Sequence, residues 1–229
     1  MKKHYPWLWF DADGTLFDYN RAEGIALEQT FHSIGIPFDD EYLDVYRRIN
    51  QGLWQALERR EITPAVLPVR RFELLREALQ LDYSPIRMSA AYLEHLALRT
   101  ELIDGAYEVL HALQTTCRIA VVTNGLQDVQ RRRLAHSEIR DFISELIISE
   151  EVGAAKPEPA FFATAFARLG SPAKSEVLLI GDSLSSDIQG GADYGLDTCW
   201  YNPSGEPRPG ALPITYEIAH LRDLLELLG

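Results

Sequence analysis

Two aspartates follow the first apolar segment of the chain, and their spacing is the first sign of chemistry. The run Trp7–Phe10 is continuously apolar, which is typical of a buried strand in a parallel sheet. Asp11 and Asp13 come next, and Gly14 then ends the extended segment. Two carboxylates at a strand end repel one another unless a cation lies between them, and oxygen ligands suit Mg²⁺. The same residues would also suit an ordinary turn, because Asp and Gly are common turn residues.

Further polar residues follow later apolar segments. The strands expected over 118–122, 146–148 and 177–180 are followed by Thr123, Asn124, Lys156, Asp182 and Asp187. In a parallel sheet with right-handed crossovers, the strand ends meet at one edge. Carboxylates gathered there would hold Mg²⁺, while Thr and Lys would bind phosphate oxygens. Each residue also has an ordinary explanation, since Thr-Asn-Gly can cap a helix and Lys commonly lies in solvent.

The apolar pattern divides the chain into an α/β core and a helical insert. In the insert, helices are expected over 21–34, after Asp39 or Asp40, from Thr63-Pro64 and from Ser84-Pro85. After residue 100, strands alternate with helices, which predicts a doubly wound, Rossmann-like parallel sheet. The remaining elements expected are helices over 126–135, 159–169, 188–194 and 218–228 and a strand over 198–201. The predicted domains are a core of 1–18 with 100–229 and a helical domain of 19–99, which could be a lid or simply a subdomain.

Composition limits the classes of partner. The 229 residues carry 22 Lys and Arg against 34 Asp and Glu, a net charge of −12. This charge disfavours a nucleic-acid polymer but allows a small phosphorylated ligand held by a local cation. Cys117 and Cys199 lie in strand-like runs, so free thiols and a cytoplasmic location are expected. The apolar run before Asp11 is too short for a signal peptide or a membrane span.

Four short segments, in order along the chain, resemble the four motifs of the haloacid dehalogenase-like (HAD) hydrolase superfamily. They are Asp11-Ala12-Asp13-Gly14-Thr15, Thr123 after an apolar strand, Lys156-Pro157, and the segment from Gly181 to Asp187. The resemblance spans the chain, and the helical insert looks like the small α-helical cap of that family. A closer resemblance, to the bacterial noncanonical pyrimidine 5′-nucleotidases, is carried by Asn50-Gln51-Gly52-Leu53-Trp54, Ile62-Thr63, Arg71-Phe72 and the segment 148–153.

The superfamily resemblance implies a role for each matching residue. Asp11 would be the nucleophile that forms an aspartyl-phosphate, and Asp13 would be the general acid and base. The dehalogenases of the superfamily lack an acid at the position of Asp13 and the transport ATPases carry Thr there, so Asp13 favours phosphate-ester hydrolysis. Mg²⁺ would be held by Asp11, the main-chain carbonyl of Asp13 and Asp182, with Asp187 assisting. The phosphoryl oxygens would be bound by Thr123, the main chain of Asn124, and Lys156.

The closer resemblance implies a Mg²⁺-dependent nucleoside 5′-monophosphate phosphatase. Asn50, Trp54 and Arg71 would then contact the leaving group, although the helical spacing of Trp54 from Asn50 is also typical of helix core. A sugar-phosphate or phosphoglycolate phosphatase and a phosphosugar mutase stay open as alternatives. A phospho-aspartate signalling module is disfavoured, because such receiver domains are much shorter and have no helical insert. The sequence makes no prediction of the oligomeric state.

Overall fold

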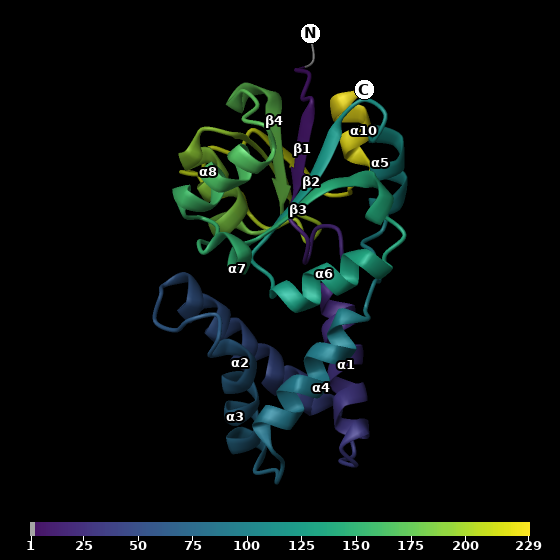
Figure 1. Cartoon of the computed structure of the whole chain (residues 1–229), viewed down its shortest axis with the longest axis vertical. Coiled ribbons are helices and arrows are strands. Elements are labelled where there is room, and N and C mark those ends of the chain that lie inside the picture. The colour runs from purple at the N-terminus through teal and green to yellow at the C-terminus, as the bar shows by residue number, and fades with distance from the viewer. Residues whose placement is uncertain (1–2) are drawn as a thin grey trace. The chain divides into compact units, whose positions relative to one another are not determined.

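The computed structural model describes residues 3–229, which form two compact units (Figure 1). The residues up to Tyr19 and Thr100–Gly229 make up an α/β unit, and Asn20–Arg99 make up a helical unit.

The α/β unit is built on a six-stranded parallel sheet. Its strands are β1 (Trp7–Phe10), β2 (Arg118–Thr123), β3 (Ile143–Ile148), β4 (Val177–Gly181), β5 (Asp197–Tyr201) and β6 (Tyr216–Ile218). The order in the sheet is β3-β2-β1-β4-β5-β6, and every neighbouring pair is parallel. The strand order reverses between β1 and β4, which is where ligands bind in open α/β sheets. The predicted doubly wound α/β fold is confirmed.

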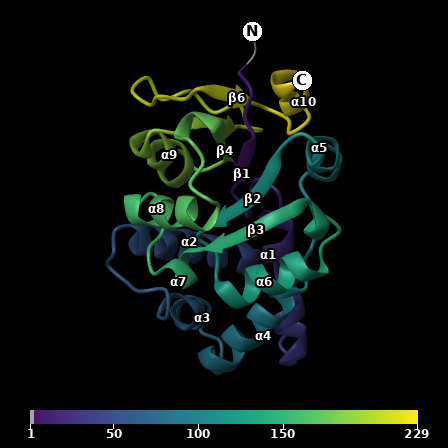
Figure 2. The same cartoon turned by 45° about the horizontal axis from the view of Figure 1, so that its top comes forward.

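Helices cover both faces of this sheet. On one face lie α5 (Ala106–Leu113) and α10 (Asp223–Leu228), and on the other lie α8 (Pro159–Arg168) and α9 (Gly190–Tyr194) (Figure 1 and Figure 2). Alternate residues of β1 enter the two cores, Leu8 and Phe10 the first and Trp7 and Trp9 the second. Burial on both faces explains why β1 is continuously apolar. The unit is completed by α6 (Gln127–His136), α7 (Ser149–Val152), the 3₁₀ turns η1 (Arg140–Phe142) and η2 (Lys174–Glu176), and the π-helical turn η3 (Leu184–Gln189).

The helical unit consists of α1 (Tyr19–Ser33), α2 (Asp40–Glu58), α3 (Leu67–Leu79) and α4 (Pro85–Ala97). Asp39 caps α2 by accepting from the main-chain N–H of Glu41, and Ser84 caps α4. The interior is aromatic: the ring centroids of Tyr46, Phe72 and Tyr92 lie 5.4 to 5.7 Å apart. These rings come from three different helices and so hold them together.

Several of the expected element boundaries are wrong, and the strand expected over 146–148 begins at Ile143. Thr63 and Pro64 form a turn, and α3 begins at Leu67, with a proline in its first turn. The helix expected over 188–194 begins earlier, because η3 precedes α9. The tail expected to be helical over 218–228 contains the short strand β6 before α10, since β5 offers an edge to which Tyr216–Ile218 add.

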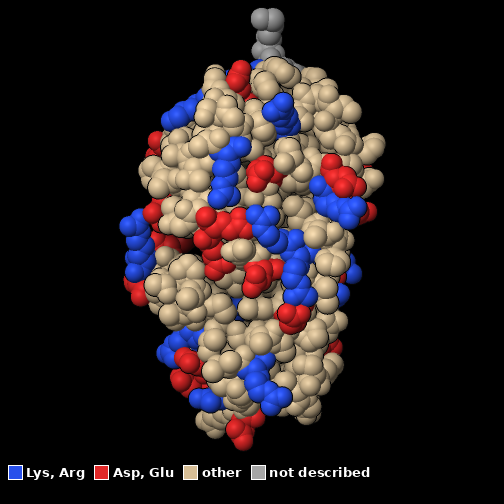
Figure 3. Space-filling model, in the orientation of Figure 1, with Lys and Arg blue, Asp and Glu red and all other residues tan. Residues whose placement is uncertain are grey.

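Charged side chains of both signs lie next to one another on the described surface in Figure 3. Arg131 pairs with Glu151, and Arg222 pairs with Asp104 and Glu108. Such alternation is ordinary for a protein that carries a net charge of −12. Within residues 3–229, every helix is too short or too polar to cross a lipid bilayer.

Candidate functional site

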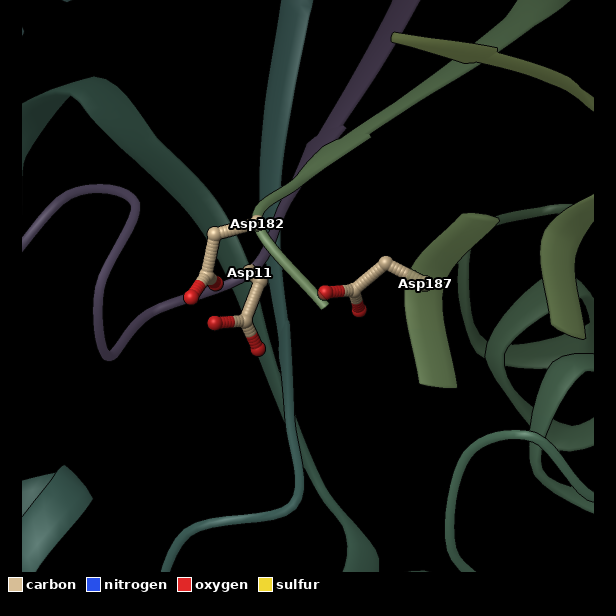
Figure 4. Close-up of side chains that lie close together, drawn as sticks. All are labelled: Asp11, Asp182 and Asp187. Atoms are coloured by element: carbon tan, nitrogen blue, oxygen red, sulfur yellow. The ribbon is translucent and has the colours of Figure 1, made fainter. Parts of the chain in front are cut away.

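Three carboxylates meet at the carboxyl ends of β1 and β4 (Figure 4). Asp11 follows β1, Asp182 follows β4, and Asp187 approaches from the turn η3. One oxygen of each lies within 4.8 Å of the others. The neighbouring strand ends are joined by a hydrogen bond of 2.9 Å from the main-chain N–H of Asp11 to the carbonyl of Ile180. The parallel pairing therefore places the predicted acids side by side.

Lys156 lies buried among these carboxylates. Its Nζ donates to Asp11 Oδ1 and to Asp187 Oδ1, both at 2.6 Å, and to the carbonyl oxygen of Val122 at 2.7 Å. An ammonium has three hydrogens, so each is used by one acceptor. Only 1% of the Lys156 side chain is exposed, which excludes the ordinary explanation of a solvated loop lysine.

Burial and mutual repulsion shift the titration of the cluster. Burial raises the pKa of Asp11 well above its ordinary value, with Asp187 and Asp182 adding to the effect and Lys156 opposing it. Burial, and then the charge of Asp187, raise the pKa of Asp182 from 3.8 to about 6. Burial alone would lower the pKa of Lys156, but Asp11 and Asp187 raise it overall. The amine therefore stays charged across the neutral range.

The donor set fits a divalent cation. A single ammonium cannot balance three carboxylates, and a doubly charged ion would supply the remaining positive charge. The ligand atoms are all carboxylate oxygens, which suit a hard ion such as Mg²⁺. Asp182 is oriented by Thr15, whose Oγ1 donates to Oδ1 at 3.1 Å, and by Trp200, whose Nε1 donates to the Asp182 carbonyl at 3.1 Å. Neither Thr15 nor Trp200 is predicted from the sequence as a support of Asp182, because both contacts join segments far apart in the chain.

Gly14 is required by both its backbone and its neighbour. Its φ is +87°, in the left-handed region that side-chain-bearing residues rarely adopt. A Cβ at this position would also lie 2.6 Å from Asp182 Oδ2. Glycine in the first motif thus leaves the space that the Asp182 carboxylate occupies.

Mg²⁺ is expected to raise the melting temperature of the protein more at pH 8 than at pH 5. A carboxyl whose pKa is raised in the fold adds stability below its unfolded value of 3.8, and that stability is lost as the pH rises through about 6. A cation binds the deprotonated form and so restores stability above that range. Thermal unfolding in MgCl₂ and in EDTA, at matched ionic strength, checks this. Asp182→Asn should lose the Mg²⁺ effect, and an equal shift in that variant would contradict the assignment.

The loops after β2 and before α8 are tied together. Thr123 ends β2, is buried, and accepts a hydrogen bond of 3.0 Å at Oγ1 from the N–H of Gly125. Asn124 donates through Nδ2 to the carbonyl of Lys156 at 2.8 Å and accepts at Oδ1 from the Lys156 N–H at 2.9 Å. Asn124 thereby fixes the segment that carries Lys156. The expected contact of its own main chain with phosphate stays a prediction.

Asp13 has partners of its own, outside the group of three carboxylates. Its side chain accepts from Gln130 Nε2 and from Arg133 Nη1, both on α6. The two acids of the first motif therefore lie in different surroundings, Asp11 beside Lys156 and Asp13 beside an arginine. The expected use of the Asp13 carbonyl as a metal ligand stays a prediction.

The predicted specificity residues Asn50 and Arg71 are buried inside the helical unit. Asn50 Nδ2 donates to Glu23 Oε1 at 3.0 Å, and Arg71 Nη1 donates to Asn50 Oδ1 at 3.4 Å. The Arg71 guanidinium lies 4.8 Å from the ring centroid of Tyr92. Trp54 is half-buried on the same helix as Asn50. Contact of these three residues with a substrate stays a prediction.

Comparison with known proteins assigns the family. Residues 7–195 match the family model of the haloacid dehalogenase-like hydrolases. HAD-hydrolase YfnB of Bacillus subtilis is 35% identical over 99% of this chain and 97% of its own length. A crystal structure of YfnB bound to magnesium has a TM-score of 0.93 to this structure and covers 99% of this chain and 100% of that chain.

Two further relatives carry the names of nucleotide hydrolases. Pyrimidine 5′-nucleotidase YjjG of Escherichia coli is 34% identical over 98% of both chains. Pyrimidine 5′-nucleotidase PynA of Streptococcus pneumoniae is 33% identical over 98% of this chain and 95% of its own length. With a family model that matches most of its length and these relatives along nearly all of it, the chain belongs to the haloacid dehalogenase-like hydrolases, as its four motifs predict.

Proposed function

We propose that this hydrolase cleaves phosphate monoesters through an aspartyl-phosphate on Asp11, with pyrimidine nucleoside 5′-monophosphates as its substrates. The observation that carries the chemistry is the different setting of the two acids of the first motif. Asp11 is buried, touches Lys156 and lies with Asp182 and Asp187, whereas Asp13 is held by side chains of α6. Two carboxylates in different surroundings can act as nucleophile and as proton carrier.

The proposed reaction has two steps. In the first, an oxygen of Asp11 attacks phosphorus, the bond from phosphorus to the leaving oxygen breaks, and Asp13 gives that oxygen its proton. In the second, water attacks phosphorus while Asp13 takes a proton from it. The bond from phosphorus to Asp11 then breaks, which releases inorganic phosphate and restores the Asp11 carboxylate.

Residues at the neighbouring strand ends would hold the phosphoryl group. Thr123 accepts from the Gly125 N–H and still has its own hydroxyl hydrogen to donate. Lys156 would bind a phosphoryl oxygen by exchanging one of the three acceptors that it now contacts. At this buried edge of the sheet, the two donors would stabilise the negative charge that develops on those oxygens.

Mg²⁺ is the proposed cofactor. Asp11, Asp182 and the main-chain carbonyl of Asp13 would hold it, with Asp187 behind them. When bound, the ion would polarise the phosphoryl group and offset the repulsion between the carboxylates and a dianionic substrate. Thr15 and Trp200 would keep Asp182 aimed at this position.

The substrate class rests on the relatives and on the helical unit. YjjG and PynA, each about a third identical to this chain along nearly all of it, are named as pyrimidine 5′-nucleotidases. Within α2, Trp54 is half-buried and so retains exposed ring surface on which a base could stack. Asn50 and Arg71 would then act by supporting this helix from within, since Glu23 and Tyr92 already engage them.

Pyrimidine nucleotides such as dUMP and dTMP are expected to show a higher kcat/KM than purine nucleotides or hexose phosphates. Trp54→Ala should lower kcat/KM for dUMP by about tenfold, the loss of one base stack, and should spare p-nitrophenyl phosphate. Steady-state kinetics with Mg²⁺ measure both effects, and exposed Gln55→Ala on the same helix is the control. If glucose 6-phosphate or phosphoglycolate is the best substrate, the nucleotide assignment is wrong. If Trp54→Ala lowers the melting temperature and every rate alike, Trp54 is core.

A further inference from the structure

Both oxygens of the Asp13 carboxylate are held by side chains of one helix. Gln130 donates to Oδ2 and Arg133 donates to Oδ1. The donors are three residues apart on α6 and so project from the same face. Gln130 is 2% exposed and Arg133 is fully buried. The carboxylate is therefore fixed at both ends by donors that cannot swing into solvent.

Apart from Asp13, the described residues offer the buried guanidinium of Arg133 no other hydrogen-bond acceptor. Its Nε and Nη2 have no hydrogen-bond partner within residues 3–229, although both are buried. Its guanidinium lies over the ring of Phe17, 5.3 Å from the centroid. The Phe17 carbonyl in turn accepts from the N–H of Gly14, so Arg133 contacts two residues, Asp13 and Phe17, of one hydrogen-bonded loop. Arginine is rarely fully buried unless it is paired, and Asp13 is the charge that pairs it.

The loop after β2 leaves room for this arrangement. A Cβ at Gly125 would lie 2.2 Å from Gln130 Nε2 and 2.8 Å from its Cδ. Glycine at this position therefore opens the path along which the Gln130 amide reaches Asp13. Because α6 begins directly after Thr123–Gly125, the helix that holds Asp13 is also continuous with the loop proposed to bind phosphate.

We propose that Gln130 and Arg133 are positioning residues that hold Asp13 in the orientation from which it protonates the leaving oxygen. This inference rests on the proposed function. Two hydrogen bonds to different oxygens fix both the place and the plane of the carboxylate. Misplacing a reacting group by about 1 Å can cost about a hundredfold in rate, so removing either donor should slow the proton transfer.

Substrates with different leaving groups distinguish this role from a structural one. The ratio kcat/KM covers the steps up to departure of the leaving group, which is when Asp13 gives its proton. The p-nitrophenolate ion leaves without being protonated, whereas the alkoxide of dUMP or of another alkyl phosphate needs the proton. A misplaced Asp13 should therefore slow alkyl phosphates selectively.

The experiment compares Gln130→Met and Arg133→Met with the wild type on dUMP, on ribose 5-phosphate and on p-nitrophenyl phosphate. We expect kcat/KM to fall by about ten- to a hundredfold for the alkyl phosphates and little for the aryl phosphate. Arg133→Lys, which keeps the charge, should recover part of the loss. Arg131→Met is the matched control, because Arg131 lies on the same helix and pairs with Glu151.

Each outcome decides the proposal. An equal loss on all substrates, or no loss, overturns the positioning role. If Arg133→Met does not fold, Gln130→Met, which removes a neutral donor, gives the answer on its own. A wild-type protein that hydrolyses no phosphate ester would instead overturn the proposed function, and this result is seen before any variant is made.

Discussion

Asp11→Asn is expected to lower the turnover of phosphate esters at least about a thousandfold, because the amide keeps the shape of the side chain but cannot attack phosphorus. Asp11 lies at the end of a central strand, where Lys156 donates to its carboxylate and Asp182 and Asp187 lie close by. The isosteric amide should leave the fold in place, because Asp187 still pairs with Lys156 in the variant. Steady-state kinetics with p-nitrophenyl phosphate and dUMP, alongside thermal unfolding, measure both effects.

The intermediate gives a second measurement of the same residue. Acid quenching of the wild type during turnover, followed by digestion and mass spectrometry, should find phosphate on the peptide that contains Asp11. Asp11→Asn should give no such peptide. Substantial turnover by the variant, or full activity of the wild type in EDTA, would contradict the covalent, metal-assisted route. A phosphorylated Asp11 that persists without turnover would favour a signalling switch.

The strands, and the edge at which the acids meet, were predictable because a strand that is buried on both faces is apolar at every position. Trp7–Phe10 is apolar at every position since both faces of β1 are covered, Leu8 facing one core and Trp9 the other. Parallel pairing then fixes where each strand ends, so Asp11 and Asp182 had to be neighbours. For the same reason five of the six parallel strands were predictable from the pattern alone.

Contacts between segments that are far apart in the chain could not be predicted from the sequence. Nothing in the sequence around Asn50 indicates that its amide would donate a hydrogen bond to Glu23 on another helix. Three arginines follow one another in α6, yet Arg131 is partly exposed and pairs with Glu151 while Arg133 is buried against Asp13. Only the rotation of the helix distinguishes them. The short strand Tyr216–Ile218 exists because β5 offers an edge, and three residues are too few for a pattern.

Lys156 is a predicted site residue that is more enclosed than its position in a loop suggests. The sequence suggested a loop lysine that binds phosphate and offsets the charge of the acidic residues, and the structure buries it among three oxygens of the protein. Its position makes it the counter-charge of the carboxylates as well as a candidate phosphate ligand. Both roles can be tested with one substitution, because one affects stability and the other affects rate.

Lys156→Met is expected to lower kcat/KM by roughly a hundred- to a thousandfold and to destabilise the metal-free protein. The rate should fall because a fixed donor to the phosphoryl group is lost. Stability should fall by about 3–5 kcal/mol, the usual cost of removing one partner of a buried ion pair. The pKa of Lys156 is raised above 10.5, so its own stabilising effect is complete below that pH and is lost only as the pH rises through the higher folded value.

Mg²⁺ separates the two effects of Lys156→Met. A divalent cation can replace the missing charge among Asp11, Asp182 and Asp187, so it should raise the melting temperature of the variant more than that of the wild type. It cannot replace the donor to phosphate, so kcat/KM should stay low in saturating Mg²⁺. Lys156→Arg is the matched control, because it keeps the positive charge. The guanidinium is larger than the ammonium, so this buried site should hold it less well. Kinetics close to the wild type in Lys156→Met would contradict the phosphate role. An unchanged melting temperature in EDTA would contradict the role as counter-charge.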